Sequence, residues 1–167
     1  MIAIQECAGQ IAQTLPKGIL LNTQGDKFNS MVIAWGHIGF IWNQPTFVAY
    51  VRQSRYTRPQ LDKTLEFVVS SPLAGGTLSP QVMRVCGSQS GYDVDKAGLF
   101  TLVPGRSVRV PAIREYPLTL ECRVLYRQNQ SLEQIPPEVL DRFYRGEDAG
   151  DYHTAYIARI VDAYVLE

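Results

Sequence analysis

Residues 118–124 alternate strictly between apolar and polar side chains, and this pattern constrains the fold more than any other stretch of the chain. The apolar positions are Leu118, Leu120, Cys122 and Val124, and the polar positions between them are Thr119, Glu121 and Arg123. Successive side chains of a β-strand point to opposite faces of its sheet. The alternation therefore predicts a strand over residues 118–126, with one face in the core and the other in water.

Six other segments have the composition of strands and are separated by turn residues. They cover residues 18–21, 31–35, 47–51, 66–70, 108–113 and 156–166. Short helices fit three gaps, residues 59–64, 79–86 and 137–144, with Ser79 as the N-cap of the second and Pro80 at its first position. Because strands and helices do not alternate as in βαβ units, we expect a mainly β protein, an antiparallel barrel with peripheral helices.

Length and charge limit the domain organisation and the partners. A chain of 167 residues suits one core, and without a repeat or linker we predict a single domain over residues 1–167. Lys+Arg and Asp+Glu both total 16, so no overall field attracts nucleic acid or an anionic membrane, and neither is expected as a partner. Any anion site has to be built locally.

The cysteines and histidines indicate a compartment and argue against a metal site. The three cysteines, Cys7, Cys86 and Cys122, are odd in number and widely spaced, and the N-terminus lacks the pattern of a secretory signal. We therefore expect a cytoplasmic protein. No run reaches the roughly 20 apolar residues that a membrane helix requires. His37 and His153 are the two histidines, and neither they nor the cysteines show a metal-ligand spacing, so no metal is expected.

Residues 51–57 bring two arginines and two hydroxyls together after an apolar, strand-like run. The guanidinium groups of Arg52 and Arg55 match the geometry of phosphate oxygens, and Ser54 and Thr57 can complete such a site together with backbone N–H groups. The alternative is an exposed basic turn in which Thr57 caps the following helix. On the first interpretation the stretch is an anion site.

A second candidate stretch leads from polar residues into a strand. Asn29 and Ser30 can hydrogen-bond the polar edge of a flat heterocycle, while Met31 and Trp35 can pack on its face. The alternative is an ordinary turn into a core strand, with Trp35 in the core.

Two further stretches complete the candidate site. Residues 86–96 follow a predicted helix and are dense in glycine and hydrogen-bonding groups, but Gln89 stands where a G-x-S-x-G motif needs its serine nucleophile. His153 can orient a ligand or a partner chain or act as an acid, or it can be a structurally satisfied histidine. The chain has neither G-x-G-x-x-G nor a Walker loop. A phosphate-bearing cofactor would therefore lie over the strands, with its phosphate at residues 52–57.

The order of these motifs resembles the flavin reductase-like family, close to its flavoredoxin branch. The motifs are residues 29–36, 51–57, 67–72, 86–96, 120–122 and 151–154. The likeness runs from about residue 17 to residue 160 and implies the FMN-binding fold of the family, an antiparallel Greek-key split β-barrel. Residues 95–99 depart from the family pattern, because members often carry a few more residues there.

The resemblance also implies a homodimer with FMN, or alternatively FAD, at the interface between subunits. Asn29, Ser30, Met31 and Val32 match the segment along the isoalloxazine, and Arg52, Ser54, Arg55 and Thr57 match the phosphate loop, with Tyr56 covering it. Ser88, Gln89 and Lys96 match a loop near the flavin tail, and His153 matches a position close to the ligand or the other subunit.

The leading functional hypothesis is an oxidoreductase that passes electrons from NAD(P)H, or from a redox protein, through flavin to free flavin or another acceptor. Hydride transfer is the chemistry of the cofactors, so no acid–base pair is demanded of the protein and no catalytic residue is assigned. The competing hypotheses are a flavin-binding or electron-relay protein without turnover, and a relative that binds haem or a deazaflavin.

Overall fold

The computed structural model describes residues 3–167, so the predicted domain of residues 1–167 begins two residues outside the described part. Seven strands form one antiparallel sheet in the order β2-β1-β5-β8-β9-β4-β3. Their bounds are β1 (Ile19–Gln24), β2 (Phe28–Ile33), β3 (Gly36–Ile41), β4 (Gln44–Arg52), β5 (Glu66–Ser71), β8 (Leu118–Asn129) and β9 (His153–Val165). A small second sheet pairs β6 (Leu102–Val103) with β7 (Ala112–Ile113).

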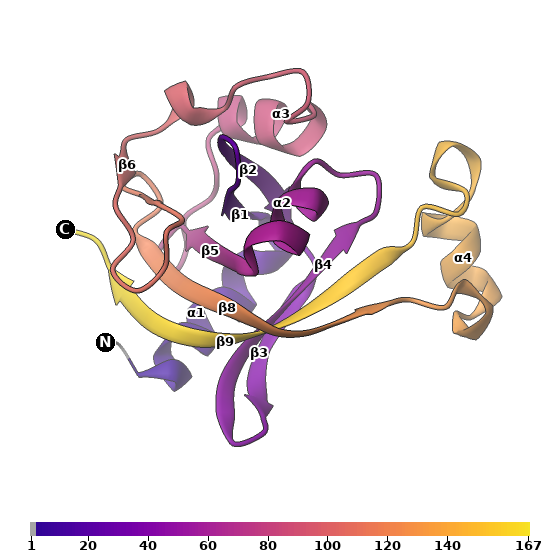
Figure 1. Cartoon of the computed structure of the whole chain (residues 1–167), viewed down its shortest axis with the longest axis horizontal. Helices are drawn as coiled ribbons and strands as arrows, with labels where there is room; N and C mark the ends of the chain where they lie inside the picture. Colours follow the sequence, from indigo (N-terminus) through magenta and orange to yellow (C-terminus); the bar gives the residue numbers. More distant parts are fainter. Residues whose placement is uncertain (1–2) are drawn as a thin grey trace.

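Within residues 3–167 four α-helices accompany the sheet: α1 (Ile4–Thr14), α2 (Thr57–Thr64), α3 (Pro80–Ser88) and α4 (Pro137–Phe143). The long strands β8 and β9 run side by side across the molecule. β8 ends and β9 begins beside α4, which stands off from the main body as an arm (Figure 1). We call residues 130–152, between these two strands, the arm. The predicted fold class is confirmed, although within residues 3–167 hydrogen bonds do not close the barrel and leave β2 and β3 as edges.

The main core lies on one face of the coiled sheet and is sealed by α1. Leu118, Leu120 and Cys122 are fully buried there, as the alternation predicts. The prediction of a wet opposite face is wrong for Thr119 and Glu121, which are also fully buried. The reason is a distant segment, residues 106–108, whose backbone N–H groups fold over the Glu121 carboxylate.

The ladder between β8 and β9 contains two register shifts, one between Glu121 and Cys122 and one between Val124 and Tyr126. Such bulges bend strands and increase their twist. They accompany the curvature that carries β8 and β9 from the core out to the arm (Figure 1).

The predicted helices are confirmed with small shifts in their bounds. The first one begins earlier, at Thr57, and the third ends at Phe143. Ser79 is the N-cap of α3, because its Oγ accepts a hydrogen bond from the Val82 N–H at 3.3 Å. Pro80 occupies the first helical position, where its missing N–H costs nothing.

The predicted local structure differs from the observed one in three respects. The strand predicted over residues 108–113 is limited to β7, because residues 106–110 form bends that cover Glu121. The strand predicted over residues 31–35 is β2, which begins at Phe28 and ends before Trp35, so Trp35 is not a core residue and is 39% exposed. Helix α1 and strand β3 were not predicted. Within residues 3–167 no helix has the length and apolar character needed to cross a membrane.

Candidate functional site

Two adjoining cavities lie where β2, the end of β4 and the start of β9 meet. The first, of about 190 Å³, has Trp35, Tyr50 and His153 in its wall, and we call it the aromatic cavity. The second, of about 70 Å³, is lined by Thr57, Lys96 and the loop after α3, and we call it the cationic cavity. Met31, Val32 and Arg55 line both cavities. A single elongated ligand can therefore span the two.

Strand β2 supplies the floor shared by both cavities. Asn29 Nδ2 donates to Thr57 Oγ1 at 2.9 Å, which joins the strand to the first turn of α2. Asn29 Oδ1 is buried and has no hydrogen-bond partner within residues 3–167. The Ser30 hydroxyl donates to Asn22 Oδ1 at 2.8 Å, so Ser30 contacts Lys96 through its backbone carbonyl. Of the predicted pair, Asn29 thus offers an unpaired acceptor, its Oδ1, and Ser30 contacts Lys96 through its backbone carbonyl.

The loop after α3 packs tightly against this floor. Cys86, Ser88 and Gln89 line the cationic cavity. Any Cβ at Gly91 would collide with Asn29 Oδ1 and the Tyr56 ring, so only glycine allows the loop to approach this closely. The loop is therefore held as one wall of the cavity.

The predicted phosphate turn divides into two parts. Arg52 donates to the carbonyl oxygens of Asp151 at 3.0 Å and Phe143 at 2.9 Å, and Ser54 Oγ donates to Asp151 Oδ2 at 2.6 Å. These two side chains bind the arm and the start of β9. Arg55, in contrast, is exposed, makes no side-chain hydrogen bond within residues 3–167 and lines both cavities. The structure thus leaves Arg55 free for a ligand and engages Arg52 and Ser54 with the chain itself.

Lys96 is the most unusual residue of the cationic cavity. It is 2% exposed, and its ammonium donates to the Ser30 carbonyl at 3.0 Å. Burial lowers the pKa of Lys96, the nearby Cys86 sulfur acts against this shift, and the positive charges of Arg55 and Lys27 lower the pKa further. Burial raises the pKa of the neighbouring Cys86 thiol, although the Lys96 charge acts against this rise. No carboxylate of residues 3–167 lines the cavity, which leaves a positive charge with no anionic partner.

The start of α2 adds to this positive field. The first N–H groups of a helix are unpaired and carry a partial positive charge. Thr57 lies at that position and lines the cationic cavity. Lys27 Nζ lies 5.3 Å from the ring centroid of Tyr56, another residue of the cavity wall. The arrangement of Arg55, Lys96, Lys27 and the helix start favours a phosphate group.

His153 closes the aromatic cavity from the β9 side. Its Nδ1 lies 2.8 Å from the Tyr144 hydroxyl, and its ring centroid lies 4.8 Å from that of Trp35. Burial and the nearby Arg52 charge lower the pKa of His153 to about 4. The imidazole is therefore neutral at neutral pH. Among residues 3–167 no cluster of three or more His, Cys, Asp or Glu side chains could hold a metal ion.

The structure brings together most of the residues that the sequence singled out. Asn29, Met31, Val32, Arg55, Tyr56, Thr57, Ser88, Gln89, Lys96 and His153 line one or both cavities, and Arg52 lines the aromatic cavity. Ser30 and Ser54 line neither. Tyr50 and Lys27 were missed. Tyr50 lies near the end of the predicted strand over residues 47–51, next to the phosphate turn, and that position was its only signal.

The fold and these two cavities define a mainly β domain with an aromatic and a cationic cavity side by side. Residues 13–167 match the family model described as the flavin reductase like domain. The chain belongs to the flavin reductase-like family, and the predicted resemblance is confirmed.

Similar proteins agree with this assignment. The chain is 27% identical to a flavoredoxin from Methanosarcina acetivorans, with a TM-score of 0.66, over 90% of this chain and 69% of that one. It is 25% identical to the flavoredoxin of Desulfovibrio vulgaris, with a TM-score of 0.64, over 90% of this chain and 69% of that one. An uncharacterized protein of Pyrococcus abyssi is 26% identical over 86% of this chain and 69% of its own length.

Proposed function

We propose that this chain binds FMN and acts as an oxidoreductase that passes electrons from NAD(P)H to free flavin or another acceptor. When bound, FMN would supply the hydride chemistry itself. The residues described above would hold and orient it and exclude water from one side. The names of the two flavoredoxins and the family of the chain support the flavin part of the proposal.

The observation that carries the proposal is the unbalanced charge of Lys96. A buried ammonium without a counter-ion is costly, and a bound phosphate would offset that cost. The cationic cavity, of about 70 Å³, is large enough for one phosphate group such as the terminal phosphate of FMN. The buried Asn29 Oδ1 can accept a hydrogen bond from a ribityl hydroxyl next to that phosphate.

The aromatic cavity suits the ring end of the same ligand. Met31, Trp35 and Tyr50 offer polarisable and aromatic surfaces for a flat heterocycle. Within residues 3–167 no carboxylate lines this cavity.

The test compares FMN with riboflavin, which lacks the phosphate. Removing a charge-assisted contact in Arg55→Ala should weaken FMN binding about ten- to hundredfold, with far less effect on riboflavin. Arg55→Lys should recover only part of the affinity, because an ammonium lacks the guanidinium fork. Arg84→Ala, on the exposed face of α3, is the matched control. Equal losses for both ligands, or none, would show that residues 51–57 are a basic surface turn.

Turnover requires a separate measurement. Anaerobic titration of the FMN-loaded protein with NADH and NADPH, followed by the flavin absorbance, should show reduction by one or both. Bound FMN that neither nucleotide reduces would favour a flavin-binding protein without this turnover.

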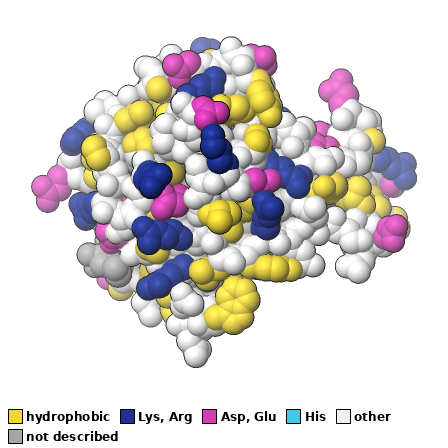
Figure 2. All heavy atoms as spheres, in the orientation of Figure 1, with side chains coloured by type: hydrophobic (Ala, Val, Ile, Leu, Met, Phe, Trp, Pro, Cys, Tyr) yellow, Lys and Arg dark blue, Asp and Glu magenta, His cyan; other side chains and the backbone are white. Residues whose placement is uncertain are grey.

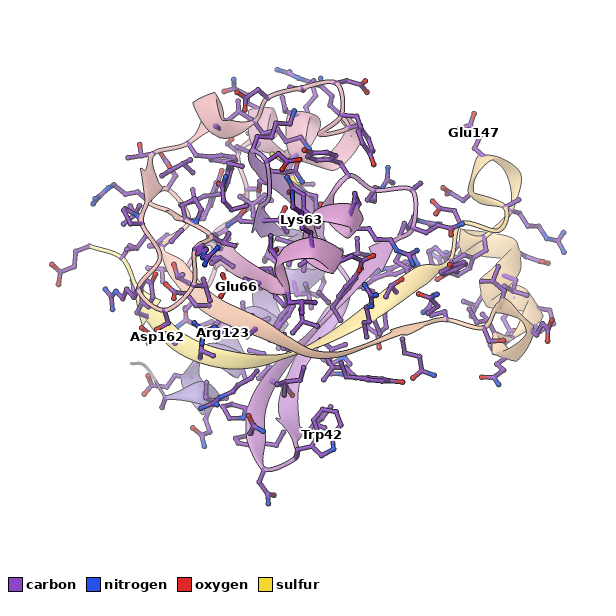
Figure 3. All side chains as sticks on the ribbon, viewed as in Figure 1. Trp42, Lys63, Glu66, Arg123, Glu147 and Asp162 are labelled. Carbon is purple, nitrogen blue, oxygen red and sulfur yellow. The ribbon has the colours of Figure 1, made fainter. Side chains whose placement is uncertain are left out.

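We also propose a homodimer with the flavin at its interface. Phe40 and Trp42, on the hairpin of β3 and β4, are 64% and 61% exposed, and Trp42 projects from the tip of that hairpin (Figure 3). Exposed aromatic residues of this kind are enriched at protein interfaces. Light scattering of the FMN-loaded protein at micromolar concentration should give the mass of a dimer, and a monomeric mass would exclude it.

A further inference from the structure

Three residues in and next to the arm, Gln130, Tyr144 and His153, form one hydrogen-bonded chain beside the aromatic cavity. Tyr144 Oη donates to Gln130 Oε1 at 2.8 Å, and the same phenol oxygen lies 2.8 Å from His153 Nδ1. The backbone N–H of His153 donates to Gln130 Oε1 at 3.2 Å. Tyr144 directly follows α4, Gln130 is the first residue of the arm, and His153 is the first residue of β9. The arm lies on the right of Figure 1.

The hydrogen positions in this chain follow from counting donors. A backbone N–H can only donate, so the Gln130 atom that faces it must be the carbonyl oxygen rather than the amide nitrogen. That oxygen also receives the single proton of the Tyr144 hydroxyl, whose pKa is raised by burial so that it stays protonated. The phenol oxygen then has only lone pairs to offer His153. His153 Nδ1 must therefore carry a proton and donate it.

The other ring nitrogen of His153 has a free lone pair that faces open space. Nε2 has no hydrogen-bond partner among residues 3–167. The side-chain atoms of these residues that are both fully buried and without a partner are Gln10 Oε1, Asn29 Oδ1 and Thr46 Oγ1, and Nε2 is not one of them. It therefore reaches solvent-accessible space, and the cavity that His153 lines is the aromatic one.

We propose that Gln130 and Tyr144 are positioning residues that hold His153 as the neutral Nδ1–H tautomer, so that Nε2 accepts a hydrogen bond from a second ligand in the aromatic cavity. The ligand class is a neutral molecule with an N–H or O–H donor, such as a primary carboxamide. A ligand that offers only a carbonyl or ether oxygen would face Nε2 lone pair to lone pair. The choice of cavity rests on the proposed function, because the second ligand is the one that meets the flavin.

The charged groups around His153 keep the imidazole in this state. Arg52 is at the end of β4, and its Cζ lies 5.3 Å from the Tyr144 ring centroid. The charges of Arg52 and Arg55 disfavour a positive charge on the imidazole. Asp148 and Asp151 of the arm act in the opposite direction but are bound to Arg52 and Ser54. Above pH 5, His153 is consequently an acceptor at Nε2 and does not serve as a general acid.

The tautomer can be measured directly by two-bond ¹⁵N–¹H correlation in protein labelled with ¹⁵N-histidine. The chain has only two histidines, and the exposed His37 can be assigned with His37→Gln. His153 should show the Nδ1–H pattern at pH 7 in the flavin-free protein, and Tyr144→Phe, which removes the acceptor of that proton, should shift it toward Nε2–H. An Nε2–H form or an imidazolium in the unaltered protein, or no change in Tyr144→Phe, would overturn the proposal.

A ligand pair tests the functional consequence in the FMN-loaded protein. Benzamide and methyl benzoate have similar size and no charge, but only benzamide has N–H donors. Benzamide should bind about three- to tenfold more tightly, as expected for one hydrogen bond, and Tyr144→Phe should remove this preference. Equal affinities in the unaltered protein would contradict the acceptor role. Since the tautomer is read without flavin, failure of FMN binding and failure of this inference give different results.

Discussion

Glu121 and Lys96 are both buried charged residues, but the fold surrounds them in opposite ways. Glu121 is fully buried and accepts hydrogen bonds from the backbone N–H groups of Arg106, Ser107 and Val108 and from the Tyr164 hydroxyl. Lys96 is equally hidden and donates to one carbonyl oxygen. A carboxylate with four donors is structurally complete, whereas an ammonium with one acceptor still lacks an anion. Their partners therefore distinguish a structural charge from a binding charge where burial does not.

The strongest test removes the satisfied charge. Glu121→Ala should lower the free energy of unfolding by at least roughly 3 kcal/mol, because several buried donors lose their acceptor at once. Urea denaturation followed by fluorescence measures the change, and Glu133→Ala, at an exposed glutamate, is the matched control. A loss of unfolding free energy as small as in the control would mean that the backbone N–H groups of residues 106–108 can hydrogen-bond to water instead of Glu121 at no cost in stability.

Removing the unsatisfied charge should have the opposite effect on the ligand-free protein. Lys96→Met keeps the length of the side chain and eliminates a buried cation, so the free energy of unfolding should rise. FMN affinity should fall about ten- to hundredfold with little change for riboflavin. Fluorescence titration and denaturation of the same samples give both values. A variant that binds FMN normally would contradict the role of Lys96 at the phosphate.

The pH dependence of stability sharpens the same contrast. The pKa of Lys96 in the folded state is below its ordinary value of 10.5, so between these two pKa values the unfolded chain binds more protons than the folded one. The stability of the ligand-free protein should therefore rise relative to Lys96→Met as the pH increases through this window. Parallel denaturation series of the two proteins measure the difference. A constant difference across the window would show that the folded state does not depress this pKa.

The smallest effect is expected for a charge pair on the surface. Lys63 and Asp26 form an ion pair at 2.8 Å but are both largely exposed. Figure 2 shows such basic and acidic side chains interspersed over the face formed by α2, β5 and β8. Water and salt screen exposed pairs, so Asp26→Asn should leave the urea midpoint unchanged within error. A clear shift of the midpoint would mean that an ion pair at short distance stabilises the fold even when it is exposed.

The sequence predicts those parts of the structure that depend on neighbours in the chain. The alternation at residues 118–124 identifies β8, and Ser79 with Pro80 identifies the start of α3, because periodicity and capping are local. Helix α1 also had a local signal, since Ile4, Cys7 and Ile11 are spaced as one helical face.

Burial that depends on distant segments could not be predicted in this way. The alternation placed Glu121 in water, and nothing near it in sequence shows that residues 106–108 cover it. Likewise Arg52 and Arg55 look equivalent as neighbours in one motif. Only the folded arm shows that Arg52 is engaged with the carbonyl oxygens of Phe143 and Asp151, while Arg55 is left for the cavities.

The two register shifts between β8 and β9 determine which way the arm faces. The first leaves Val161 of β9 without a partner in the ladder, and the second leaves Leu125 of β8 without one. Each strand thus contains one extra residue, so the two shifts cancel. Tyr126 to Asn129 therefore pair with β9 in the same register as Leu118 to Glu121. Deleting Leu125 alone would leave the arm one residue out of phase and turn Gln130 to the opposite side of the ribbon from His153. The side of the ribbon on which Gln130 meets the imidazole of His153 thus depends on two compensating register shifts, several residues away along each strand.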